Sequence, residues 1–116
     1  MTGLTPSHRY MLYRGIVDFR NGFDGLCGLV QRELGGDPAD GSVWIFINRR
    51  RDRMKMLAWE PGGFMLYYKR LESGTIEFPS PGPGQGKIVI SWAVLVMMLE
   101  GIRVDKIVHK KRYRRA

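Results

Sequence analysis

The stretch from Val43 to Phe78, VWIFINRRRDRMKMLAWEPGGFMLYYKRLESGTIEF, decides the fold of this chain. It starts with the apolar run Val43–Ile47, continues through a polar segment at 48–52, and then alternates apolar and polar side chains. This pattern is typical of a strand, a polar tip and a returning strand. Pro61, which two glycines follow, favours a reversal before another aromatic-rich extended segment at 64–71. The sequence therefore predicts two consecutive β-hairpins.

The returning strand carries two different faces. Side chains on a strand alternate with a period of two. One predicted face is apolar and the other is basic with an aromatic end: Met54, Met56 and Ala58 form the first, and Arg53, Lys55, Leu57 and Trp59 form the second.

Two amphipathic or apolar segments predict helices. The first follows Asn21, which we expect to cap it, and ends at two glycines, with an apolar stripe of Phe23, Leu26, Val30 and Leu34 together with Cys27. The second covers Trp92–Glu100, with Ser91 as the cap and Gly101 as the stop. Short strands are expected at 10–15 and 87–90. We predict an α+β fold, in which an antiparallel sheet of about four to five strands carries both helices on one face.

The chain has 116 residues, and we expect residues 1–105 to form a single α+β domain followed by a basic C-terminal tail at 106–116. One cysteine excludes an internal disulfide. The longest nearly apolar run, 88–99, is shorter than the roughly 18 to 20 residues that span a bilayer. The N-terminus shows no secretory signal. These features predict a cytoplasmic protein that does not contact membranes.

Positive charge is concentrated in two places. The net charge is +8, and six of the 19 Lys and Arg residues lie in the tail at 106–116, which has no acidic residue. The segment Asn48–Lys55 adds five basic residues and one acid. Clustered charge of this kind makes a local field that attracts polyanions.

Catalytic chemistry is not indicated. Two histidines and one cysteine without ligand spacing argue against a metal site, and no phosphate-binding glycine loop or cofactor motif is present. Four acidic residues that could converge are better explained as turn, cap and ion-pair residues: Asp18, Asp24, Asp52 and Glu60. We predict no catalytic residue, metal or cofactor, and keep a metal-dependent nuclease as the weaker alternative.

Basic side chains interleaved with aromatic rings on strands are typical of nucleic-acid binding, because phosphates accept hydrogen bonds from Arg and Lys while bases stack on rings. DNA and RNA both fit this pattern. The alternative is a purely structural role, in which Trp59, Tyr67 and Tyr68 belong to the core and the charged side chains form the solvent-exposed face of a sheet. The predicted nucleic-acid-binding residues are Arg49, Arg50, Arg51, Arg53, Lys55, Trp59, Tyr68, Lys69, Arg70, Lys110, Lys111, Arg112, Arg114 and Arg115.

Three segments resemble a known family. DFRNGFDGL from Asp18, NRRRDRMKMLAWEPGGFMLYYKRLESGTIEFP from Asn48, and the later MLEGI are similar to the small TnpB accessory proteins of bacterial insertion sequences of the type numbered sixty-six. Glu60 stands where the family pattern has an aspartate. The matching residues are Asp18, Arg20, Gly22, Phe23, Asp24, Gly25, Arg50, Asp52, Arg53, Lys55, Trp59, Tyr68, Lys69, Arg70, Leu71 and Glu72.

The resemblance implies a role in transposition beside a separate transposase, TnpC, without strand transfer by this chain. Combined with the charge pattern, it predicts a non-catalytic accessory protein that binds DNA, at the insertion-sequence ends, through the basic and aromatic hairpin surface and the basic tail. The alternative is an adaptor that docks the transposase without touching DNA. The oligomeric state is left open.

Overall fold

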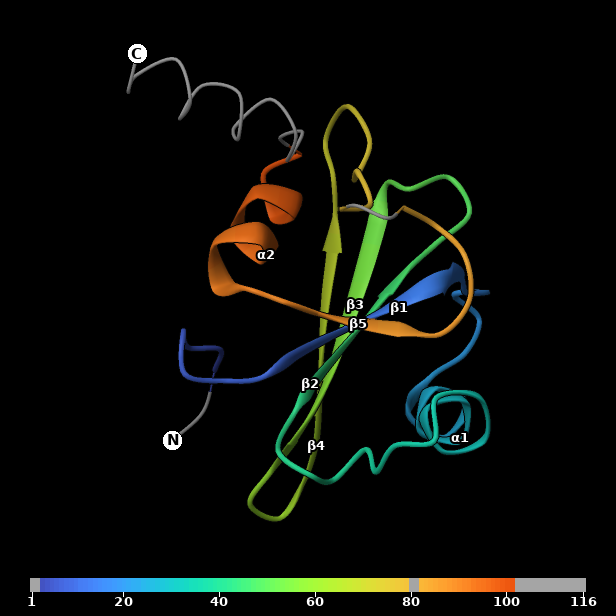
Figure 1. Ribbon diagram of the computed structural model, residues 1–116, viewed down its shortest axis with the longest axis vertical. Helices are drawn as coiled ribbons and strands as arrows, with labels where there is room; N and C mark the ends of the chain where they lie inside the picture. Colours follow the sequence, from blue (N-terminus) through green and yellow to red (C-terminus); the bar gives the residue numbers. More distant parts are fainter. Residues whose placement is uncertain (1–2, 80–81, 102–116) are drawn as a thin grey trace.

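The computed structural model describes residues 3–79 and 82–101. It contains five strands and two helices, and the predicted α+β fold is confirmed (Figure 1). The elements in chain order are β1 (Tyr10–Ile16), α1 (Phe23–Glu33), β2 (Val43–Ile47), β3 (Arg53–Glu60), β4 (Gly63–Arg70), β5 (Lys87–Ile90) and α2 (Trp92–Leu99). The predicted tail at 106–116 lies outside the described residues.

All five strands form one sheet in the order β4-β3-β2-β1-β5. Strands β2, β3 and β4 are the two predicted hairpins, and β5 returns to pair with β1 in antiparallel fashion. Strands β1 and β2 run parallel, so the prediction of a wholly antiparallel sheet was wrong at this pair. The reason is that α1 connects them, and a helical crossover brings the chain back to the same end of the sheet.

The two helices cover opposite faces of the sheet, so the expectation that both pack on one face was also wrong (Figure 1). Leu95 and Met98 of α2 join a cluster with Ile45, whereas Leu26 and Val30 of α1 join a cluster on the other face. All five residues of β2 are buried, because alternate side chains enter these two clusters. A continuous apolar run is the signature of a strand covered on both faces.

The helix ends differ in how they are capped. Ser91 caps α2 as predicted, since its Oγ accepts a hydrogen bond from the Val94 amide at 3.1 Å. Helix α1 instead begins after Gly22, and no side chain caps it. Asn21 was the wrong candidate, because its Nδ2 donates to the Asp18 carbonyl oxygen at 2.9 Å and holds the preceding loop.

The register of the second hairpin fixes which side chains share a face. Strand β3 pairs with β4 through a two-residue loop, with Glu60 opposite Gly63 and Arg53 opposite Arg70. The predicted faces of β3 are confirmed where the two clusters test them: Met54, Met56 and Ala58 join the α2 side, and Leu57 joins the α1 side.

Candidate nucleic-acid interface

The Asn48 side chain, together with backbone hydrogen bonds, holds the turn between β2 and β3. Asn48 Oδ1 accepts hydrogen bonds from the backbone amides of Asp52 and Arg53 at 3.1 and 3.0 Å. Its Nδ2 donates to Asp52 Oδ1 at 2.6 Å. Arg51 has a left-handed backbone, with φ 56°. This closed network fixes the backbone of the turn, so the arginines that it carries are presented from a defined position.

The carboxylate inside this turn does not neutralise the arginines. The Asn48 side chain lowers the pKa of Asp52 by hydrogen bonding to it, and the charges of Arg53 and Arg50 act in the same direction. Among residues 3–79 and 82–101, the sole ion pair joins Asp18 to Arg20. Within that part of the chain, the guanidinium groups of the turn therefore have no carboxylate bound to them.

Strand pairing places two of the predicted residues beside Arg53. Arg70 lies directly opposite Arg53, and Tyr68 lies opposite Lys55, so all four belong to the face that α1 covers. Arg53 Nη1 donates to the Tyr68 hydroxyl at 3.2 Å. Tyr68 remains 52% exposed. Lys69 pairs with Met54 and belongs to the other face, so it does not join this group.

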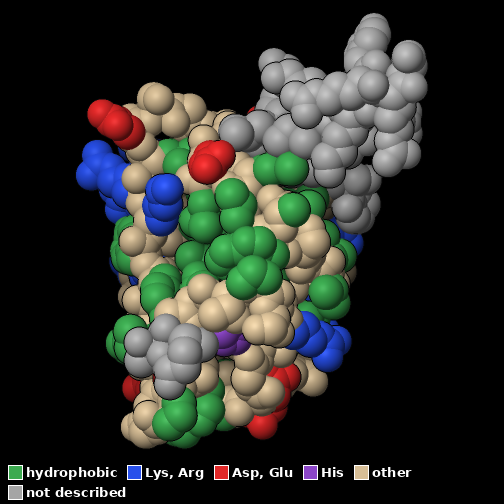
Figure 2. All heavy atoms as spheres, turned by 90° about the vertical axis from the view of Figure 1, so that its left-hand side faces the viewer, with side chains coloured by type: hydrophobic (Ala, Val, Ile, Leu, Met, Phe, Trp, Pro, Cys, Tyr) green, Lys and Arg blue, Asp and Glu red, His purple; other side chains and the backbone are tan. Residues whose placement is uncertain are grey.

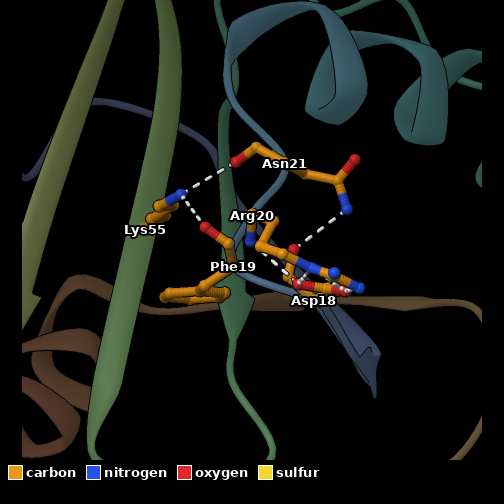
Figure 3. Close-up of polar contacts among 5 residues, drawn as sticks. All are labelled: Asp18, Phe19, Arg20, Asn21 and Lys55. Carbon is orange, nitrogen blue, oxygen red and sulfur yellow. Dashed lines mark hydrogen bonds and ion pairs between the residues drawn. The ribbon is translucent and has the colours of Figure 1, made fainter.

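Lys55, one of the predicted nucleic-acid-binding residues, points into the protein. Its side chain is buried, at 5% exposure, and Nζ donates to the carbonyl oxygens of Phe19 and Asn21 at 2.9 and 2.8 Å (Figure 3). The ammonium also lies 4.9 Å from the centre of the Phe19 ring and 5.2 Å from that of Tyr68. Lys55 therefore ties the loop before α1 to the sheet. Its buried ammonium is not exposed on the surface where a phosphate would bind.

The loop before α1 is itself ordered by an exposed acid. Asp18 receives hydrogen bonds from Arg20 through the backbone amide at 2.9 Å and through Nη2 at 2.6 Å (Figure 3). The Arg20 side chain is the main reason that the pKa of Asp18 falls to about 2. The pair stays charged at neutral pH, and it fixes this loop beside the arginine turn.

The loop and the turn enclose a cleft of about 570 Å³. We call it the arginine cleft. Its lining residues are Ile16, Val17, Asp18, Phe19, Asn48, Arg49, Arg50 and Arg53. The site prediction had missed the Ile16–Phe19 wall, although the matched DFRNGFDGL segment was a signal that could have found part of it.

Two further predicted residues lie away from the cleft. The Arg51 guanidinium packs over the Phe78 ring, 5.6 Å from its centre. Trp59 is 41% exposed and stacks edge-on against Phe64 at 5.0 Å. It lies six residues along β3 from Arg53, about 20 Å at the rise of a strand. The five predicted residues of the tail lie outside the described part of the chain: Lys110, Lys111, Arg112, Arg114 and Arg115.

The acids of the nuclease alternative do not converge. Asp52 precedes β3 and Glu60 ends it, which separates them by eight residues, about 27 Å. Glu60 Oε2 accepts from the Tyr67 hydroxyl at 2.9 Å and from the Gly3 amide at 3.3 Å. In the described ranges, no three His, Cys, Asp or Glu side chains are grouped to hold a metal ion. The same residues contain no helix that is long and apolar enough to cross a bilayer.

Comparison with known proteins identifies relatives across most of the chain. The uncharacterized protein y4jC of Sinorhizobium fredii is 39% identical over 79 residues, which cover 68% of each chain. The uncharacterized protein y4hO of the same organism is 37% identical over 95 residues, covering 81% of this chain and 80% of the relative. No solved structure matches. The family model described as IS66 Orf2 like protein matches residues 8–109. The chain therefore belongs to the IS66 Orf2-like family, the TnpB accessory proteins that serve transposition of these insertion sequences.

Proposed function

We propose that this accessory protein binds DNA through the arginine cleft during transposition. The observation that carries the proposal is that Arg49, Arg50 and Arg53 line one cleft on a rigid turn, without a bound carboxylate in the described part of the chain. Like charges that line one cleft repel one another, and a bound polyanion relieves the repulsion. Guanidinium groups also form paired hydrogen bonds with phosphate oxygens.

Neighbouring side chains extend the surface beyond the cleft. Arg70 lies beside Arg53 and supplies a further phosphate contact. The exposed Tyr68 ring offers a surface on which a base can stack. The tail residues from Lys106 add contacts along the backbone of the nucleic acid. Lys55 has no part in this surface, because its ammonium is bound inside the protein.

The role that we propose is non-catalytic. The protein acts in the cytoplasm at the insertion-sequence ends, beside the transposase TnpC, and takes no part in breaking or joining strands. Phosphate contacts carry no sequence preference by themselves. Recognition of the ends therefore comes from arginines that reach base edges or from the transposase.

The salt dependence of DNA binding tests the proposal. If the protein neutralises about six phosphates, the logarithm of the affinity should fall against the logarithm of the salt concentration with a slope near −5. Fluorescence anisotropy of labelled duplex and single-stranded oligonucleotides between about 50 and 200 mM salt measures this slope. A flat response, or no binding at the low-salt end, would overturn the proposal.

A matched pair of variants locates the binding surface. Changing Arg49 and Arg50 to alanine should weaken binding about tenfold or more and reduce the slope by about two, because each contact contributes about one to it. The control changes Arg9 and Arg32 to alanine, which removes the same charge from exposed positions that do not line the cleft. Equal effects of the two double variants would show that total charge, and not the cleft, governs binding.

A second candidate function has its own observation. Figure 2 shows hydrophobic side chains gathered in the middle of the face that carries α2. Half-buried Trp92 and Val94 of this helix pack on the core while keeping part of their surface exposed. Such a surface suits an adaptor that docks the transposase. If Val94→Glu abolishes binding to purified TnpC while DNA is not bound at any salt concentration, the adaptor is the correct description.

A further inference from the structure

Strand β4 ends the sheet with an unpaired side. Its pairing with β3 begins at Glu60 and Gly63, which close a two-residue loop and so form a hydrogen-bonded pair. Alternation along the ladder then directs the backbone groups of Phe64, Leu66 and Tyr68 away from β3. Across residues 3–79 and 82–101, no backbone group outside β3 is hydrogen-bonded to β4. Eight residues therefore present an open template for another strand.

The two edges of the sheet are protected to different extents. Strand β5, at the other edge, has four residues, and a short edge is a poor template. Strand β4 is twice as long, pairs with β3 without a register shift, and contains no proline. Met65 and Tyr68 are 41% and 52% exposed along it. An edge that is long, regular and apolar pairs readily with a further strand.

The charge on β4 selects the orientation of a partner strand. Lys69 and Arg70 lie at its C-terminal end, and glycines lie at its start. A parallel pairing of two copies would set lysine beside lysine and arginine beside arginine. An antiparallel pairing instead places these cations beside Gly63 and Gly62 of the partner subunit, where like charges do not face each other.

The register follows from the same reasoning. A two-fold axis through Leu66 sets Met65 beside Tyr67 of the partner subunit and Tyr68 beside Phe64 of the partner subunit. An axis through Tyr67 would instead set Met65 beside a lysine. The first register sets the exposed Met65 and Tyr68 beside aromatic side chains of the partner subunit, and opposite positions keep to the same face of the sheet.

We propose that two copies of this chain pair through β4 in antiparallel fashion about Leu66, which joins two five-stranded sheets into one continuous sheet. A failure of this proposal would leave binding at the arginine cleft untouched, because no residue that lines the cleft lies on β4 and the test uses no DNA.

Disulfide trapping tests the register. In a Cys27→Ala background, Leu66→Cys sets two thiols opposite each other with Cα atoms about 5.5 Å apart, within reach of a disulfide. Met65→Cys is the control, because the two introduced cysteines would be about 8 Å apart. Mild oxidation followed by a non-reducing gel should give a cross-linked dimer for the first variant and monomer for the second. Cross-linking of neither, or of Met65→Cys in preference, overturns the proposed register.

Sedimentation equilibrium tests the interface itself. The chain of 13.3 kDa should sediment at twice that mass at micromolar concentration. Leu66→Lys sets two ammonium groups opposite each other at the axis and should raise the dissociation constant at least tenfold. Val89→Lys makes the same kind of change at the β5 edge, where Val89 is 59% exposed, and should leave the constant within twofold.

A wild-type chain that stays monomeric, or a dimer that Val89→Lys dissociates while Leu66→Lys does not, overturns the proposal. Circular dichroism establishes that each variant is folded. If Leu66→Lys fails to fold, the cysteine pair still decides the matter, because it leaves the edge uncharged.

Discussion

Arg53 and Lys55 lie two residues apart on the same face of β3, yet one lines an open cleft and the other is buried. Arg53 lines an open cleft and donates to the exposed Tyr68 hydroxyl. Lys55 is buried and donates to two backbone carbonyl groups of the loop before α1. The difference is that carbonyl groups of this loop bind the Lys55 ammonium, whereas the Arg53 guanidinium is left facing the cleft between the loop and the turn. A basic side chain on a strand therefore has a structural role where a loop covers it, and it is free to bind a ligand where nothing covers it.

The largest expected effect in this comparison comes from removing the buried cation. Lys55→Met should lower the free energy of unfolding by about 2 to 3 kcal/mol, because two carbonyl oxygens lose a charged donor. Urea denaturation followed by tryptophan fluorescence measures the change. Arg53→Met is the matched variant on the same face and should cost less than about 0.5 kcal/mol. Similar losses for both would remove the distinction between the two cations.

The turn that presents Arg53 can be loosened without touching an arginine. Asn48→Ala removes the acceptor for the Asp52 and Arg53 amides and should cost about 1 to 2 kcal/mol of stability. DNA affinity should also fall, by about three- to tenfold, since the arginines are no longer held in place. Asp52→Asn leaves both backbone hydrogen bonds to Asn48 Oδ1 in place and is the control for stability. Unchanged affinity in folded Asn48→Ala would show that the turn does not need to be fixed.

A smaller effect is expected at the exposed hydrogen bond between Arg53 and Tyr68. Tyr68→Phe removes the hydroxyl that Arg53 contacts but keeps the ring. Stability should change by less than about 0.5 kcal/mol, because the bond is at the surface. Binding to a single strand should persist, whereas Tyr68→Ala should weaken it by about 1 to 3 kcal/mol if a base stacks there. Isothermal titration with a short oligonucleotide distinguishes these outcomes.

The smallest effect concerns pH. The Asp18 pKa is about 2 in the folded protein against 3.8 ordinarily, so its ionised form favours the fold. This contribution is present above the ordinary pKa of 3.8 and is lost as the pH falls through about 2, below which both states are protonated. Stability curves of the wild type and Asp18→Asn should therefore differ above about pH 4 and converge below about pH 2. Curves that stay parallel through that range would contradict the role of the Arg20 pair.

Local patterns account for most of the elements. The alternation at 53–59 and the Pro61 reversal predicted both hairpins, and Ser91 and Gly101 bounded the second helix. The prediction of both helices on one face fails because the strand at Val43–Ile47 is apolar at every position and not only at alternate ones. A strand buried on both faces needs a helix on both.

The site was harder to predict, because it depends on distant pairs. Which of Tyr67 or Tyr68 faces the arginines depends on the two-residue loop that sets the register of β4. Lys55 is buried because its ammonium binds two backbone carbonyl groups that lie 34 and 36 residues earlier in the chain. Every residue type has a backbone carbonyl group. No side-chain pattern marks such a partner.

The order of the strands has a consequence for how the chain matures on the ribosome. Strand β1 is made first but lies between β2 and β5, and β5 comes from residues 87–90. Until those residues emerge, β1 has an unsatisfied edge, and the β2 face that α2 later covers is bare. A nascent or truncated chain that stops before Lys87 thus exposes a strand and an apolar face together, and these are the features that recruit chaperones and promote aggregation.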